Sequence, residues 1–154
     1  MRPTRWYVLV ALAAVSGAVG YLVTRSYYID LPSPTIYAQL SLFVLAIAEG
    51  YTASLTKARI EGRQGTRPID PLVVARLVAL AKASSIAGAV AAGAYAGFLG
   101  WVAQIDSTTA HQDVRTSVAG VAAGLALIAG ALYLEWAGRV PKVEDDSGDV
   151  SPAR

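Results

Sequence analysis

The sequence predicts an all-α membrane protein with four transmembrane helices in a compact bundle and both termini in the cytoplasm. The chain has 154 residues, of which 55% are hydrophobic and only 16% charged, and its mean hydropathy is +0.46. A soluble domain has about 25% charged residues. Four long apolar stretches could each supply the roughly 20 residues that cross a bilayer core as a helix. None of them shows the polar–apolar alternation that is typical of strands.

These stretches set the expected boundaries. We expect one transmembrane domain over residues 1–140, followed by an acidic tail, 141–154, whose composition predicts disorder. The first apolar run is longer than the 7–15 residues of a signal peptide, so we interpret it as a retained helix, with cleavage as the alternative. The expected helices cover about residues 6–25, 36–57, 71–105 and 115–138.

The third stretch is too long for a single bilayer crossing. A helix over residues 71–105 would be roughly 50 Å long, against about 30 Å for the hydrocarbon core. Asp70 is a good N-cap and Pro71 suits the first helical position, so the helix should begin there. We therefore expect its first turns to protrude, with Arg76 at headgroup level or above and Lys82 near the boundary.

Basic residues predict the orientation, because loops rich in Lys and Arg tend to remain in the cytoplasm. They precede the first helix, fill the segment between the second and third, and follow the fourth. Both termini and the basic segment should therefore be cytoplasmic. The basic residues concerned are Arg2, Arg5, Lys57, Arg59, Arg63, Arg67, Arg139 and Lys142.

Four ionisable residues lie within or beside the apolar stretches: Glu49, Arg76, Lys82 and Glu135. Such groups are costly in a membrane and are usually paired or functional. One hypothesis is a polar network that pairs Glu49 with Lys82 and Arg76 with Glu135. In the alternative, the two basic side chains extend to phosphates and Glu135 sits in water. Glu49, roughly 10 Å inside by helix rise, should be buried and either paired or protonated.

Small residues recur at four-residue spacing, which lets helix backbones approach closely. The pairs are Gly93 with Gly97, Gly120 with Gly124 and, more weakly, Ser16 with Gly20. We interpret them as packing contacts within one chain, with homodimerisation as the second possibility.

Several kinds of chemistry are disfavoured. The chain has no cysteine, which excludes disulfides, thiolate metal sites and cysteine nucleophiles. With one histidine, an all-protein zinc or haem site is not expected. His111 lies near Asp106, Ser107 and Asp113, but we expect these residues in one flexible outer loop, an ordinary polar turn rather than a catalytic triad. The net charge of +2 is too small to indicate nucleic-acid binding. We expect no enzyme activity and no cofactor.

The segment 62–88, with the sequence GRQGTRPIDPLVVARLVALAKASSIAG, resembles a family of small actinobacterial membrane proteins classified only as a domain of unknown function. The resemblance extends to Glu49, to Leu134 and Glu135, and to the Arg139–Val140–Pro141 segment, and it covers most of the chain except the tail. It implies a four-helix protein of the bacterial plasma (inner) membrane, often encoded beside folate-biosynthesis genes. It implies no activity and no catalytic residues.

Two functional hypotheses follow. The first is a non-enzymatic scaffold or accessory subunit whose cytoplasmic loop presents Arg59, Arg63 and Arg67 to anionic lipid headgroups, a protein partner or another copy of the chain. The simpler alternative for this loop is that its charges only determine topology. The second hypothesis is a small transporter or channel with an intramembrane site made by Glu49 and Lys82. An enzyme ranks third, because only Arg, Lys and Glu are available at that face.

Overall fold

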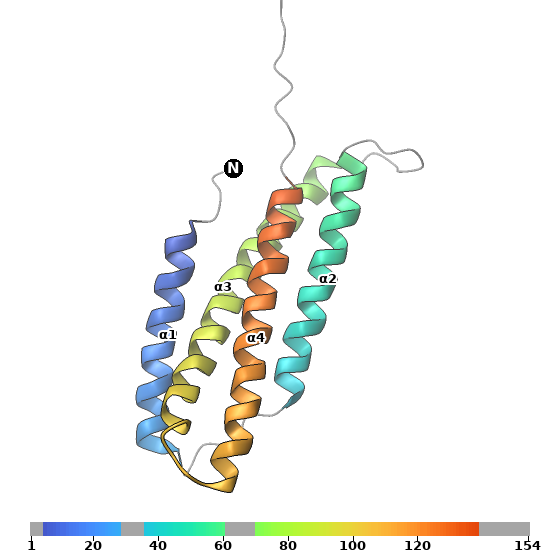
Figure 1. Ribbon diagram of the computed structural model, residues 1–154. Coiled ribbons are helices and arrows are strands. Elements are labelled where there is room, and N and C mark those ends of the chain that lie inside the picture. Colours follow the sequence, from blue (N-terminus) through green and yellow to red (C-terminus); the bar gives the residue numbers. More distant parts are fainter. Residues whose placement is uncertain (1–4, 29–35, 61–69, 139–154) are drawn as a thin grey trace, which may run out of the picture.

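The chain folds into four α-helices in the computed structural model, which describes residues 5–28, 36–60 and 70–138 (Figure 1). Each helix is long and apolar enough to cross a membrane, and the described residues contain no strand. The predicted all-α fold with four such helices is therefore confirmed. In chain order, the helices are α1 (Trp6–Tyr27), α2 (Ile36–Ile60), α3 (Pro71–Val102) and α4 (Thr108–Ala137).

Successive helices run in opposite directions, so the start of α1, the end of α2, the start of α3 and the end of α4 share one end of the molecule (Figure 1). We call this the basic end, because Lys57, Arg59 and Arg76 lie there. The segment 61–69, with Arg63 and Arg67, and the tail 141–154 lie outside the described residues. The predictions made for them stay predictions.

The helices form an open row in the order α1, α3, α4, α2. Over the described residues, α1 packs along α3 but along neither α2 nor α4, and α2 packs along α4 while meeting α3 only locally. The prediction of a compact bundle was wrong in this respect. The physical reason is that α3 offers small residues on two of its faces, one for α1 and one for α4.

The contact between α3 and α1 depends on glycine. A Cβ atom added to Gly97 would overlap the backbone oxygen of Gly17, and one added to Gly93 would overlap the backbone of Ala13 and the hydroxyl of Ser16. On the α1 side of the same contact, a Cβ atom added to Gly20 would come within 2.8 Å of the Ala94 oxygen. These small residues therefore allow backbone-to-backbone packing.

The contact between α3 and α4 uses the same principle. A Cβ on Gly124 would come within 2.7 Å of the Ala92 nitrogen, and one on Gly88 within 2.9 Å of the Gly124 oxygen. Gly120 faces the ring of Tyr95. Together with the α1–α3 contact, this confirms that the small-residue pairs pack within one chain.

Apolar clusters at the two ends show that α3 runs diagonally across the row. At the basic end, Ala81 of α3 packs with Ala53 of α2 and Leu134 of α4. At the opposite end, Phe98 and Val102 of α3 pack with Ala110 of α4 and with Tyr28, the residue that follows α1. Consequently α3 contacts α2 where α3 begins, and is flanked by α1 where it ends.

Helix boundaries differ most from prediction in α4, which begins at Thr108 rather than at residue 115. The Ser107 side chain accepts a hydrogen bond from the Ala110 nitrogen at 3.1 Å and caps the helix. The first turns were assigned to a loop because their exposed positions are polar and mask the helical pattern. Elsewhere α1 and α2 extend slightly further than expected, to Tyr27 and Ile60, and α3 ends earlier, at Val102.

The start of α3 agrees with the sequence. Asp70 accepts a hydrogen bond from the Leu72 nitrogen at 2.8 Å, and Pro71 occupies the first turn. Because α3 has 32 residues, it is about 48 Å long. It therefore exceeds one bilayer core of about 30 Å, as predicted.

We predict that Gly97→Ala weakens the packing of α1 on α3, because the new methyl group would meet the Gly17 backbone, which cannot move without moving the helix. Overpacking of this kind typically costs about 1–3 kcal/mol. Thermal unfolding of the purified protein in detergent measures the effect. Gly50→Ala on α2 is the matched control, since nothing lies within 4 Å of its added Cβ. Equal stability of the two variants would contradict the packing described here.

Candidate functional site

The candidate site is built around Glu49, which is only 3% exposed although it carries a carboxyl group. The buried residues of α2 are Gln39, Ala46, Glu49, Ala53 and Thr56, and their helical spacing places them on one face. That face is turned toward α4 and the start of α3, as the contacts of Ala53 show. Glu49 therefore points into the protein, one turn deeper than the cluster that joins α2, α3 and α4.

Neither carboxyl oxygen of Glu49 has a hydrogen-bond partner among the described residues. Ser84 of α3 is the hydroxyl-bearing residue beside this carboxyl group, and it is itself only 6% exposed. Its geometry does not complete a hydrogen bond to Glu49. The neighbouring Ser85 donates its hydroxyl to the Lys82 backbone oxygen at 2.9 Å. Glu49 thus faces a small polar surface on α3 without being bonded to it.

The remaining members of the predicted network are distributed unevenly. Arg76 is exposed, Lys82 is half-buried and Glu135 is only 5% exposed. The sequence predicts a pairing of Glu49 with Lys82, and no hydrogen bond joins the two side chains. The alternative that placed Glu135 in water was wrong for the described structure, because α4 turns Glu135 inward beside the buried Leu134.

A cation–π contact at the basic end was not anticipated from the sequence. The Lys57 ammonium lies 3.8 Å from the ring centroid of Trp136, which stacks on Tyr133 at 5.8 Å between centroids. Lys57 is half-buried, whereas Arg59, from the predicted lipid or partner surface, is exposed. The contact joins the last turns of α2 and α4. The sequence indicates Lys57 as a topology charge or a contact for anionic lipid or an acidic partner, but gives no sign of its contact with Trp136.

A second buried polar layer lies nearer the opposite end. The Gln39 amide, 1% exposed, donates to the Tyr95 hydroxyl at 3.2 Å and toward the Thr116 backbone oxygen at 3.5 Å. The Tyr95 ring lies over Gly120, where any larger residue would collide with it. This layer joins α2, α3 and α4. A sequence signal existed, because Gln39 shares the helical face of Glu49.

At the opposite end, Asp113 of α4 is 5% exposed and accepts a hydrogen bond from the Tyr28 hydroxyl at 3.0 Å. The pKa of Tyr28 is raised above its ordinary value of 10.0, first by burial and then by the hydrogen bond to Asp113 and its negative charge. This bond connects the end of α1 to α4, although α1 itself does not pack along α4. Sequence reasoning missed it because Asp113 was placed in a loop.

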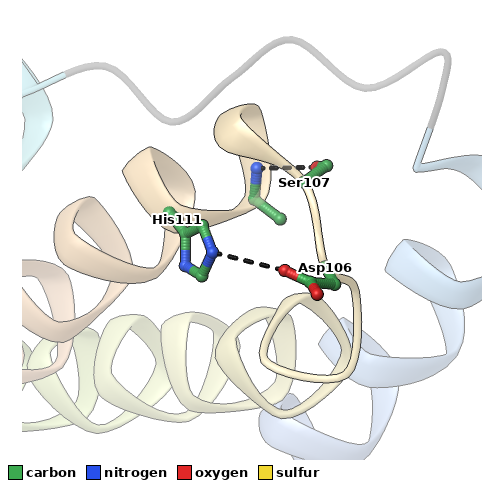
Figure 2. A network of polar contacts seen from close by, with 4 residues as sticks. Asp106, Ser107 and His111 are labelled. Carbon is green, nitrogen blue, oxygen red and sulfur yellow. Dashed lines mark hydrogen bonds and ion pairs between the residues drawn. The ribbon is translucent and has the colours of Figure 1, made fainter.

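His111 and Asp106 lie at the start of α4, on the surface of the protein. Figure 2 shows the Ser107 side chain directed at the nitrogen of the first turn of α4, and His111 directed at Asp106. The His111 Nε2 lies 3.5 Å from an Asp106 oxygen, and both side chains are exposed to solvent. Ser107 is committed to the helix cap, whereas Asp113 is bonded to Tyr28. The prediction that these residues share one flexible outer loop was wrong, because Ser107 caps α4 and His111 and Asp113 lie within its first turns.

The two polar layers are separated by small apolar side chains. Glu49 and Gln39 are about 15 Å apart along α2, and the buried side chains between them are those of alanines and one leucine, with glycines where α3 meets α4. No three His, Asp or Glu side chains gather to form a metal site in the ranges 5–28, 36–60 and 70–138. The chemistry that Glu49 can perform on its own is to hold and release a proton. The separating residues are Ala46 of α2, Ala89 and Ala92 of α3, and Ala123 and Leu127 of α4.

Four long apolar helices with inward-turned polar side chains suggest a multi-pass membrane protein. More specifically, the chain belongs to the family described as protein of unknown function (DUF3180), whose model matches residues 9–142. The match includes Glu49, Ser84 and Glu135. No curated protein and no solved structure matches the chain. Membership of a family of unknown function, implied by the resemblance, is thereby confirmed.

We predict that Tyr28→Phe destabilises the protein by about 1–3 kcal/mol, because Asp113 would remain buried without its donor. The raised pKa of Tyr28 means that the folded state holds this proton more tightly than the unfolded state. The contribution is thus fully present below about pH 10 and is lost as the pH rises through the folded pKa. Unfolding of wild type and variant, measured against pH, should converge at high pH. The exposed Tyr51→Phe is the control.

Proposed function

We propose that this protein is a non-enzymatic integral membrane protein that serves as a scaffold or accessory subunit. Both termini and the basic end would face the cytoplasm, and the membrane would be a bacterial plasma membrane. The resemblance seen in the sequence, with its actinobacterial origin and its folate-biosynthesis gene neighbourhood, supports this setting. It also supports an accessory role, since it carries no activity.

The observation that carries the proposal is the open helix row. In the most apolar part of α1 only 11% of the residues are buried, and in the corresponding part of α2 the buried share is 22%. In both α3 and α4 this share is 39%. The two edge helices therefore present most of their apolar surface to whatever surrounds the protein. On α1 this surface includes Val15, Val19 and Leu22, and on α2 it includes Val44 and Ile47. Lipid or a partner helix could cover such edges.

The basic end supplies the polar part of the proposed surface. Arg59 and Arg76 are both exposed, and Lys57 is held on Trp136. With Arg63 and Arg67 of the intervening segment, they would attract anionic lipid headgroups or an acidic surface of a protein partner. Exposed arginine suits either role, because its guanidinium binds carboxylate and phosphate through two hydrogen bonds. An edge helix and this basic end together would fix a partner in the membrane plane.

We predict that replacing Arg59 and Arg76 with alanine abolishes recovery of the partner after crosslinking in native membranes, while leaving insertion unchanged. The partner is identified by mass spectrometry and compared between variant and wild type. Arg115→Ala is the matched control, because Arg115 is exposed on α4 near the opposite end. Undiminished recovery with the double variant would reject the basic end as the docking surface.

A transporter or channel is the second candidate, with Glu49 and Lys82 as its site. The specific observation in its favour is that the Glu49 oxygens have no hydrogen-bond partner among the described residues, since substrate sites keep such groups available. Against it, buried apolar side chains such as Ala92 and Leu127 separate Glu49 from the layer of Gln39 and Tyr95. A continuous polar path would require the helices to rearrange.

If the second candidate is correct, purified protein in sealed vesicles will carry a proton or ion flux, and Glu49→Gln will stop it without unfolding the chain. The substitution removes the ionisable oxygen but keeps the size of the side chain. Flux is followed with a pH-sensitive dye inside the vesicles. Exposed Arg115→Ala again provides the control. A wild-type protein that moves nothing would eliminate this candidate.

A further inference from the structure

Glu49 differs from the other buried carboxyl groups by its surroundings. Asp113 accepts the hydroxyl of Tyr28, and Glu135 lies at the basic end within the last turn of α4. Glu49 lies deeper, is 3% exposed, and has no hydrogen bond to either oxygen within the described part of the chain. An ionised carboxylate that is this deeply buried and makes no hydrogen bond is strongly unfavourable, so burial favours the protonated form.

The α3 surface beside Glu49 suits a neutral acid better than an anion. It contributes the Ser84 side chain, whose hydroxyl can either donate or accept a hydrogen bond. Ser85 is unsuitable because its hydroxyl already donates to the Lys82 backbone oxygen. A protonated Glu49 could therefore donate to Ser84 after a small rotation, whereas an ionised Glu49 would have one candidate donor for two oxygens.

We propose that Glu49 is a proton-binding site, in which the carboxyl group holds a proton while α2 is docked on α3 and α4, with Ser84 as its polar neighbour. The inference goes beyond the scaffold or transport proposals and does not depend on either. A chain that moves nothing across a bilayer can still hold this proton.

The proton exchanges with solution through the basic end. In that direction the apolar cluster of Ala53, Ala81 and Leu134 comes first. The polar residues Thr56, Lys82 and Glu135 neighbour the members of this cluster along α2, α3 and α4, and Lys57 follows Thr56. The titratable groups on this side of Glu49 are Lys57 of α2, Lys82 of α3 and Glu135 of α4. In the other direction, the buried alanines and Leu127 extend about 15 Å along α2 before Gln39 and Tyr95 are reached.

Loss of the proton would act on helix packing. Glu49 lies one turn below the cluster of Ala53, Ala81 and Leu134, where α2 meets both α3 and α4. Deprotonation would place an anion in this interface, with the Ser84 hydroxyl as the candidate donor for one of its two oxygens. Proton occupancy and docking of α2 are therefore coupled, and by linkage a ligand that separates α2 would release the proton.

Infrared spectroscopy of the full chain in lipid vesicles tests the proposal directly, because a protonated carboxyl group has a C=O stretch that an ionised one lacks. At neutral pH, the difference between wild type and Glu49→Gln should contain this band, and the band should shift in heavy water as the proton exchanges. Glu135→Gln is the matched control and should retain the band. If the band is absent from the wild-type-minus-Glu49→Gln difference, Glu49 is ionised and the proposal fails.

An apolar carbodiimide provides a chemical readout of the same site. The acid proton passes to a carbodiimide nitrogen while the carboxyl oxygen bonds to the central carbon, so only the protonated acid reacts. Mass spectrometry should locate the adduct on Glu49, with yield falling as the pH is raised, and no adduct should form at this position in Glu49→Gln. Labelling confined to Asp113 or Glu135, together with no infrared band from Glu49, would overturn the assignment.

Discussion

The close approach of α3 to two neighbouring helices is the constraint on which the rest of the structure depends. Gly93 and Gly97 leave no room for a side chain against α1, and Gly88 of α3 and Gly124 of α4 leave none where these two helices meet. Helices held by backbone contact have little freedom to slide, because any shift brings Cβ atoms into collision. α3 is therefore the central element, while α1 and α2 are left as edges, each held mainly by one neighbour.

The diagonal course of α3 determines which helices each buried polar group connects. Where α3 begins, it meets α2 and α4 and encloses Glu49 beside Ser84. Further along, Tyr95 reaches across Gly120 to the amide of Gln39. Where α3 ends, α1 has replaced α2 as a neighbour, and Tyr28 reaches Asp113. Each polar side chain thus joins helices at a defined depth, and alanine fills the space between the layers.

Particular residues show how far sequence reasoning reached. Asp70 and Pro71 specify the start of α3 through local hydrogen bonding and backbone geometry, so that boundary was predictable. The start of α4 at Thr108 was not predictable, because the first turns of α4 expose polar side chains and lack an apolar stripe. The burial of Glu49 followed from its depth in an apolar stretch. The predicted partner of Glu49 was Lys82, but no hydrogen bond joins the two side chains. Depth along a helix does not determine the direction in which a side chain points.

The sequence by itself determined that the chain forms four long apolar helices, that the third exceeds one bilayer crossing, and that small residues mediate packing, since these are properties of composition and spacing. Only the tertiary structure decided which helices touch. The order α1, α3, α4, α2 depends on which faces of α3 fit which neighbours, and several pairings satisfy the same four-residue spacing. That order placed Glu49 at a three-helix junction, with Ser84 rather than Lys82 beside its carboxyl group.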